Sequence, residues 1–257
     1  MLKFKTINAL FLATLALLLV YERVFALPYR AFGFLLFAYL VIQAYGSAVL
    51  SAQFFLPVRY KGNEHSNSVA LTFDDGPVPG RTEKILDILK LHEVSAAFFC
   101  IGSRVADHPG LAKRIHEAGH LLGNHSYWHR MTFDLQAAQK IGRELSDTDE
   151  VIQRTIGVKP NFFRPPYGVT NPMVARAVRM GGYNTIGWTI RSFDTLIKSP
   201  ATLMARVTKS LKAGDVILFH DNGHTTLEIL PALLDHVSKI GLKIVRLDEL
   251  LNENAYA

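Results

Sequence analysis

The sequence predicts an α/β fold with a parallel sheet, preceded by an apolar N-terminal region. After residue 68, short apolar runs that suit strands alternate with longer amphipathic segments that suit helices. Several of the amphipathic segments end at a glycine, which is common at helix C-termini. The hydrophobic residues, 49% of the chain, are unevenly placed, and two long stretches near the N-terminus carry no charge.

The two uncharged stretches are candidates for membrane-spanning helices. They cover residues 7–21 and 31–58, and a helix needs about 20 residues to cross a bilayer, so the second stretch is long enough and the first, at roughly 15 residues, is marginal. We therefore expect residues 1–57 to form a membrane anchor with two transmembrane helices, over about 7–21 and 31–56. The first stretch also fits a secretory signal, because Lys3 and Lys5 precede a short apolar run.

Two spans would place the N-terminus and the rest of the chain on one side of a bacterial-type inner or plasma membrane. The side stays open, because basic residues flank both the outer ends of the pair and the loop inside it. They are Lys3, Lys5, Arg59 and Lys61 at the outer ends, and Arg23 and Arg30 in the loop. The single cysteine, Cys100, excludes an intrachain disulfide and fits a reducing compartment without excluding an oxidising one.

The net charge, the distribution of basic residues and the spacing of glycines indicate which partners to expect. The net charge of +6 favours contact with acidic surfaces such as membrane lipid headgroups. Lys and Arg are scattered and no basic stripe with interleaved aromatic residues occurs, so nucleic acid is not an expected partner. Neither apolar stretch contains Gly-x-x-x-Gly, a spacing that pairs membrane helices, and the oligomeric state stays open.

After the apolar region we expect a polar linker over residues 58–67 and one domain over residues 68–257. The predicted strands cover residues 69–73, 96–101, 120–123, 162–164, 183–188, 216–220 and 242–245. The predicted helices cover residues 81–92, 109–118, 135–156, 171–180, 200–211 and 226–240. These repeated strand–helix units favour a parallel sheet of about seven strands, closed as a barrel or left open.

Chemically reactive side chains follow the ends of several predicted strands. They are Asp74 and Asp75 after the first, His125 and His129 after the third, Arg164 at the fourth, Trp188 and Asp194 around the end of the fifth, and His220 at the sixth. In parallel α/β barrels, the C-terminal rim gathers catalytic groups from different strands. We therefore expect these residues to meet in one site.

A metal site is the first chemistry that these residues suggest. His125 and His129 are four positions apart, so on one helical turn, or in a tight loop, both imidazoles can share a cation. One aspartate of the pair Asp74–Asp75 would complete a two-histidine, one-carboxylate set that suits zinc or a similar divalent ion. The other aspartate would act as general base on a metal-activated water. Alone, Asp-Asp-Gly-Pro is also an ordinary turn sequence, and a histidine pair also occurs on plain surfaces.

The remaining residues supply an acid and its supports. His220 follows an apolar strand, and a histidine oriented by a carboxylate such as Asp194 suits protonation of a leaving group. The fixed charge of Arg164 would hold a base carboxylate ionised and in position. Trp188 and Leu218 fit either the packed core or the wall of a small apolar pocket.

Residues from about 68 to 250 resemble the NodB-type polysaccharide deacetylases, a carbohydrate esterase family. The resemblance rests on five motifs in order: Thr-Phe-Asp-Asp-Gly-Pro at 72–77, His-Ser-Tyr-Trp-His at 125–129, Arg-Pro-Pro-Tyr at 164–167, Trp188 with Asp194, and Leu-Phe-His at 218–220. It implies a distorted (β/α) barrel, usually of seven strands. It also implies removal of acetyl groups from N-acetylated sugars, or sometimes O-acetyl groups, with a divalent metal, most commonly Zn²⁺ and otherwise Co²⁺ or Mn²⁺.

The resemblance also assigns a role to each motif residue. Asp74 would be the general base, Asp75, His125 and His129 the metal ligands, and His220 the general acid. Arg164 would steady the base and Asp194 would orient the acid. The Tyr167 amide would hold the oxyanion, and Leu218 would line the acetyl-methyl pocket near Trp188.

The fourth motif departs from the family pattern. Relatives often read Trp-Asp-x-Asp-x-x-Asp-Trp, whereas this chain reads Trp188-Thr-Ile-Arg-Ser-Phe-Asp194-Thr. Arg191 and Thr195 thus stand where an acid and a tryptophan are common. We expect catalysis to survive the change and Arg191 to favour an acidic or phosphate-bearing substrate.

The sequence thus predicts a membrane-anchored, metal-dependent hydrolase that deacetylates N-acetylated amino sugars of a peptidoglycan- or chitin-like glycan. One alternative is an O-acetyl esterase, and another is a deformylase or deacetylase of a lipid-linked sugar. A third is a non-catalytic carbohydrate-binding protein on the same fold.

Overall fold

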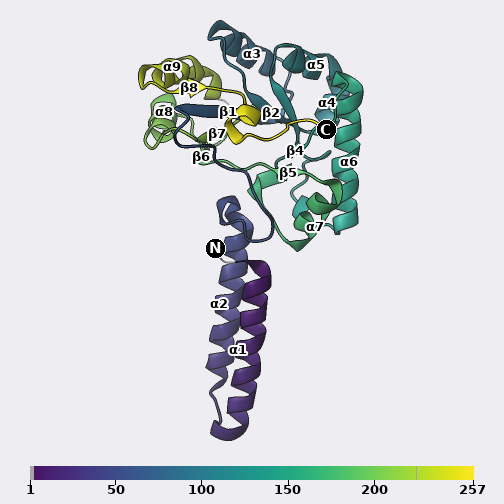
Figure 1. Ribbon diagram of the computed structural model, residues 1–257, viewed down its shortest axis with the longest axis vertical. Helices are drawn as coiled ribbons and strands as arrows, with labels where there is room; N and C mark the ends of the chain where they lie inside the picture. Colours follow the sequence, from purple (N-terminus) through teal and green to yellow (C-terminus); the bar gives the residue numbers. More distant parts are fainter. Residues whose placement is uncertain (1–2, 224) are drawn as a thin grey trace.

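The computed structural model describes residues 3–223 and 225–257. A hairpin of two long helices projects from an α/β domain (Figure 1). The hairpin helices are α1 (Phe4–Phe25) and α2 (Tyr29–Ala48), and they lie side by side along their length. Both are long and apolar enough to cross a membrane by length and composition, and most of their surface is exposed. The same length and composition are found in N-terminal signal sequences.

The first helix is longer than predicted, and the second ends at Ala48 rather than near residue 56. The apolar run continues past Ala48 because its last residues pack in the domain and not in the second helix. After a short 3-10 turn at Leu50–Ala52, the buried side chains of Leu56 and Val58 join a core cluster of the domain, whereas Phe54 packs against Phe4 and Gly46 of the hairpin. The last residues of the uncharged stretch therefore belong to the domain core.

The start of the predicted linker also packs on the domain. Arg59 pairs with Ile186 in a parallel bridge, and Lys61 pairs with Asp215 in an antiparallel one. The end of α2 also contacts the domain, because Ser47 Oγ donates a hydrogen bond to the Thr170 carbonyl oxygen at 2.7 Å.

The domain is built on an open, curled parallel sheet, which confirms the predicted fold class. Its strands are β1 (Ser68–Gly76), β2 (Ala97–Cys100), β3 (Leu121–Asn124), β4 (Phe162–Phe163), β5 (Asn184–Thr185), β6 (Ile190–Arg191), β7 (Val216–His220) and β8 (Lys243–Ile244). The order is β5-β4-β3-β2-β1-β7-β6, a path of seven strands, and β8 pairs with the start of β1. All neighbouring pairs are parallel.

The strand predicted over residues 183–188 corresponds to β5 alone, and β6, which follows at Ile190–Arg191, was not predicted. Ile186 N donates to the Phe163 carbonyl on the β4 side, whereas Thr189 N donates to the Val216 carbonyl on the β7 side. One segment of chain therefore passes from one edge of the sheet to the other. It cannot stay a single strand, because its hydrogen-bonding partner changes at Gly187.

Helices cover the outside of the sheet (Figure 1). They are α3 (Thr82–Leu91), α4 (Gly102–Asp107), α5 (Pro109–Glu117), α6 (Ala138–Ile156), α7 (Pro172–Gly181), α8 (Pro200–Thr208), α9 (Thr226–Lys239) and α10 (Leu247–Leu251). The short helices α4 and α10 were not predicted. The other six lie within a few residues of the predicted ranges, and the largest differences are the start of α6 and the end of α8.

The central strand β1 separates the helical layer from the interior of the curl. Alternate side chains of a strand point to opposite faces. Phe73 packs outward between Phe98 and Phe219, with ring centroids 5.1 and 6.0 Å away. Thr72 and Asp74 point inward. The alternation thus delivers Asp74 to the inside of the curl, at the C-terminal end of the strand.

Candidate active site

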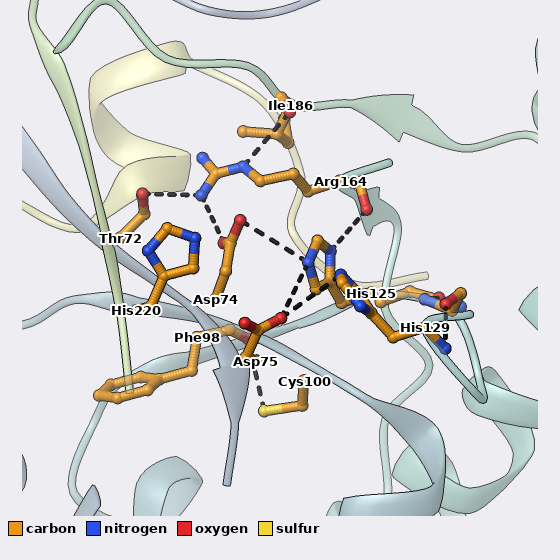
Figure 2. Close-up of polar contacts among 12 residues, drawn as sticks. Thr72, Asp74, Asp75, Phe98, Cys100, His125, His129, Arg164, Ile186 and His220 are labelled. Atoms are coloured by element: carbon orange, nitrogen blue, oxygen red, sulfur yellow. Dashed lines mark hydrogen bonds and ion pairs between the residues drawn. The ribbon is translucent and has the colours of Figure 1, made fainter. Parts of the chain in front are cut away.

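Asp74 sits on the floor of the site, beside the final residue of β7. The register of β1 and β7 pairs Asp74 with His220. Asp74 is buried, and its Oδ1 accepts a hydrogen bond from Arg164 Nη1 at 2.7 Å. Its Oδ2 lies 3.7 Å from His125 Nε2 (Figure 2). One carboxylate oxygen is therefore bound to Arg164 and the other faces the histidines.

Arg164 is wholly buried behind Asp74 and is fixed on every side. Its Nη1 also donates to Thr72 Oγ1 at 2.8 Å, and its Nη2 donates to the Gly187 carbonyl at 2.9 Å. The guanidinium carbon lies 4.1 Å from the Phe99 ring centroid. Burial lowers the pKa of Arg164, and Asp74 opposes that shift. A buried guanidinium needs a matched anion, and Asp74 is that anion.

Asp75, His125 and His129 form a compact group of possible metal ligands. Asp75 Oδ1 is 3.6 Å from His125 Nε2 and 3.4 Å from His129 Nε2. The candidate ligand atoms all lie within 4.8 Å of one another. The histidines lie in a tight loop after β3 rather than on a helix, and His129 has a φ of 50°. This loop brings both Nε2 atoms to the same carboxylate.

The ring orientations of the two histidines suit a cation. His125 Nδ1 lies 2.8 Å from the Arg164 carbonyl oxygen and donates its proton there, which leaves Nε2 as the ring nitrogen that faces Asp75. Burial and the neighbouring His125 lower the pKa of His129 to about 4. Although burial raises it, the two histidines lower the pKa of Asp75 overall. One carboxylate and two imidazole Nε2 atoms fit the donor set of a divalent zinc-type site.

His220 lies on the floor beside Asp74, on the side away from the two metal-ligand candidates His125 and His129 (Figure 2), and it is held by Asp194. His220 Nδ1 lies 2.7 Å from Asp194 Oδ1, and the His220 main-chain N–H donates to Asp194 Oδ2 at 2.8 Å. Burial alone would lower the pKa of His220, but the hydrogen bond to Asp194 and the nearby carboxylates raise it overall. With Nδ1 bound to Asp194, Nε2 is the ring nitrogen left for a ligand.

A cavity of about 220 Å³ joins these groups. Eight of the ten predicted site residues line it, namely Asp74, Asp75, His125, His129, Tyr167, Trp188, Leu218 and His220. The other two, Arg164 and Asp194, are buried behind the wall and each holds one lining residue. The structure thus brings together residues that are far apart in sequence.

Tyr167 and Trp188 shape the mouth of this cavity. Tyr167 has a φ of 58°, and its hydroxyl donates to the His129 carbonyl oxygen at 3.2 Å. Gly168, the next residue, lies against Trp188, and a Cβ there would overlap the Trp188 ring. Glycine at 168 therefore allows the ring to close against the tyrosine segment.

Several supporting residues were not predicted. Asn222 Nδ2 donates to Asp75 Oδ2 at 3.3 Å, and Arg104 donates to the Asp75 carbonyl oxygen. Thr226 Oγ1 donates to Asp194 Oδ2 at 2.6 Å, and Ser192 Oγ donates to Asp194 Oδ1 at 2.9 Å. Asn222 follows the last motif by two positions and could have been suspected. The others are common polar residues with no distinguishing pattern.

The fold and site define a class, namely curled α/β barrels whose rim holds an Asp-His-His group between an aspartate and a histidine. Comparisons with known proteins give the family. The polysaccharide deacetylase family profile matches residues 61–186. The peptidoglycan-N-acetylglucosamine deacetylase PgdA of Listeria monocytogenes is 35% identical over 72% of this chain and 39% of its own length. The peptidoglycan-N-acetylmuramic acid deacetylase PdaA of Bacillus subtilis is 32% identical over 76% of this chain and 75% of its own length. This chain therefore belongs to the polysaccharide deacetylase family.

Solved structures agree with this assignment. The Bc1960 peptidoglycan N-acetylglucosamine deacetylase superposes with a TM-score of 0.72, at 30% identity, over 77% of this chain and 94% of its own. A CE4 family pseudoenzyme from Bacillus anthracis superposes with a TM-score of 0.71, also at 30% identity, over 76% of this chain and 68% of its own. The family thus contains similar members described as an enzyme and as a pseudoenzyme.

Proposed function

We propose that this protein is a metal-dependent hydrolase that removes acetyl groups from N-acetylated amino sugars of a peptidoglycan-like glycan. One observation carries the proposal. Asp74 and His220 face one cavity beside the Asp75–His125–His129 group, and each is held by a buried partner. The names of similar proteins, which include N-acetylglucosamine and N-acetylmuramic acid deacetylases, support the substrate class.

Asp75, His125 and His129 would hold the metal. A divalent ion bound there would polarise the acetyl carbonyl and lower the pKa of a water to about 7. Zn²⁺ suits this donor set best, and Co²⁺ and Mn²⁺ are alternatives.

The chain's own residues would move the protons. Asp74 Oδ2, the oxygen not bound to Arg164, would accept a proton from the attacking water. The Tyr167 main-chain N–H would donate to the carbonyl oxygen as negative charge develops there. His220, oriented by Asp194, would donate a proton from Nε2 to the departing amine. Leu218 would pack against the acetyl methyl group.

The similarity to a pseudoenzyme favours a second candidate, a carbohydrate-binding protein without turnover. This chain has a base, an acid and three possible metal ligands around one cavity, and each has the neighbours that its role requires. A binding protein has no need for that arrangement. The enzyme is therefore the stronger proposal.

Acetate release tests the proposal. The full chain in detergent would be stripped of metal, supplied with Zn²⁺, Co²⁺ or Mn²⁺, and offered chitin oligomers, peptidoglycan fragments and acetylated xylan. Metal-restored release that is lost in Asp74→Asn supports a deacetylase, and the panel separates N-acetyl from O-acetyl substrates. Asp147→Asn, on the exposed face of α6, is the matched control. Glycan binding without release, despite bound metal, would favour the binding protein.

The hairpin supports a further proposal, attachment to the inner or plasma membrane. Its two apolar helices are mostly exposed, and the end of α2 is hydrogen-bonded to the domain between Ser47 and Thr170. Extraction of cell membranes with alkaline carbonate tests this. The full chain should stay in the membrane pellet, whereas cleavage of residues 1–25 as a signal would release a shorter chain.

A further inference from the structure

Arg191 in β6 belongs to the catalytic cavity and also to a hollow beside it. It lines the 220 Å³ cavity, and its register partner on β7 is Leu218, two residues before His220. The adjoining surface hollow, of about 280 Å³, is lined by Thr189, Ile190, Arg191, Arg206, Lys209 and Ser210. The charged residues around this hollow are all basic. Arg191 therefore brings a positive surface to the mouth of the cavity.

Aromatic rings hold the guanidinium groups in place. The guanidinium carbon of Arg191 lies 5.5 Å from the Trp188 ring centroid and 4.9 Å from that of Phe193. Arg206 lies over the same Phe193 ring, at 4.4 Å, and its Nε donates to the Arg191 carbonyl oxygen at 3.0 Å. Phe193 has a φ of 60°, a conformation that costs energy in a non-glycine residue. Two arginines thus converge on one fixed ring.

These two arginines have no counter-anion within residues 3–223 and 225–257. None of the ion pairs there involves Arg191 or Arg206, and the Arg191 guanidinium makes no side-chain hydrogen bond. Arg164, in contrast, binds Asp74, and Arg246 binds Asp248. Like charges that share a ring repel each other, and a bound anion would relieve that repulsion.

We propose that Arg191, Phe193 and Arg206 form an anion-binding subsite that selects N-acetylated amino sugars bearing a carboxylate or phosphate group. The inference rests on the proposed deacetylase function. An acetyl group that reaches Asp74 and the Asp75–His125–His129 group places its sugar ring at the cavity mouth, beside Arg191. A guanidinium binds a carboxylate or phosphate with two parallel hydrogen bonds, so a charged substituent gains affinity there and a neutral sugar does not.

Matched ligands test the subsite. A saccharide that contains N-acetylmuramic acid would be compared with its neutral methyl ester, and N-acetylglucosamine 6-phosphate with N-acetylglucosamine. Dissociation constants would be measured by calorimetry on the full chain carrying Asp74→Asn, which prevents turnover, and kcat/KM on the wild type. We expect the acidic member of one pair to bind about 10-fold more tightly. The pair that shows the preference identifies the anion as carboxylate or phosphate.

Substitutions test whether Arg191 and Arg206 cause the preference for acidic ligands. Arg191→Gln should weaken binding of the preferred acidic ligand about 10-fold and leave its neutral partner unchanged, because the lost contact is to the charge alone. Arg206→Gln should have a smaller effect in the same direction. Arg191→Lys keeps the charge without the planar fork and should fall between, which separates loss of charge from misfolding. Arg143→Gln, exposed on α6, is the matched control.

The outcomes separate this inference from the proposed function. Equal affinity for the acidic and neutral members of both pairs, or an equal loss for both on Arg191→Gln, overturns the subsite. Preferential binding of an acidic ligand without acetate release by the wild type keeps the subsite and overturns the deacetylase. Acetate release at equal kcat/KM from charged and neutral substrates keeps the deacetylase and overturns the subsite.

Discussion

The floor and the rim of the 220 Å³ cavity are built in different ways. On the floor, Asp74 and His220 are each held by a buried partner, Arg164 or Asp194. On the rim, Arg191 has no ionic partner among the described residues, and Leu196 is 74% exposed. A paired group keeps one geometry, which proton transfer needs. An unpaired group is free to bind what arrives, so we infer that the floor sets the reaction and the rim sets the substrate.

The largest expected effect comes from weakening the hold of Asp194 on His220, the proposed general acid. Asp194→Asn keeps the side-chain shape but removes the charge that orients His220 Nδ1. We expect kcat for acetate release to fall about 10²- to 10⁴-fold, the usual worth of a general acid. Metal content, measured by atomic absorption, should not change, because Asp194 lies outside the Asp75–His125–His129 group. A variant with normal kcat would contradict the proposed role of Asp194 as the residue that orients His220.

The next effect tests whether the floor is fixed by ion pairing. Arg164→Met leaves Asp74 buried without its partner, and we expect the free energy of unfolding to fall by about 3–5 kcal/mol. Denaturation in urea measures this. Arg154→Gln, which breaks an exposed pair with Glu150, should cost less than about 1 kcal/mol. Similar costs for the two variants would contradict the contrast between floor and surface.

A third prediction concerns His120, a buried histidine outside the cavity, and the pH dependence of the free energy of unfolding. Burial lowers the pKa of His120 to about 4 from an ordinary 6.5, and its Nδ1 accepts a hydrogen bond from the Ala96 N–H. Between these two pH values the unfolded chain binds a proton that the folded chain does not. The stability due to neutral His120 is therefore complete above pH 6.5 and is lost as pH falls towards 4, by about 3 kcal/mol.

His120→Asn keeps an acceptor near Nδ1 but cannot titrate. Its free energy of unfolding, measured in urea on metal-free protein at pH 7, 5.5 and 4, should fall less steeply than that of the wild type. His120→Phe should show the same shallower pH dependence with lower stability throughout, because the Ala96 N–H loses its acceptor. Equal slopes for wild type and both variants would mean that folding does not lower the pKa of His120.

Sequence patterns were enough to predict the sheet and the residues around the cavity. Alternation of apolar strands and amphipathic helices predicted seven parallel strands, and each motif fell at the end of a strand. The roles of these residues remain predictions, although the structure brings them together. Strand β6, just after the strand predicted over residues 183–188, could not be predicted, because it depends on a change of hydrogen-bonding partner from Phe163 to Val216.

The residues that hold Asp194 and Asp75 in place could not be predicted for a similar reason. Thr226 binds Asp194 from 32 positions away, and Arg104 reaches the Asp75 carbonyl from 29 positions away. Threonine and arginine are common on any surface, so their residue types alone carry no signal. Long-range pairing becomes visible only when the strands are placed side by side. The unpaired state of Arg191 is likewise a property of the fold, although its departure from the family motif was visible.

The smallest expected effect tests the rim as a surface that can change without harm to the floor. Leu196 lines the cavity mouth and is 74% exposed, so Leu196→Ser removes little buried area. We expect the free energy of unfolding to change by less than about 0.5 kcal/mol. In acetate-release assays KM should rise about 2- to 3-fold while kcat stays the same, because only contact with the sugar is lost. A fall in kcat as large as that of Asp194→Asn would show that the rim also positions the reacting groups, and the division between floor and rim would then fail.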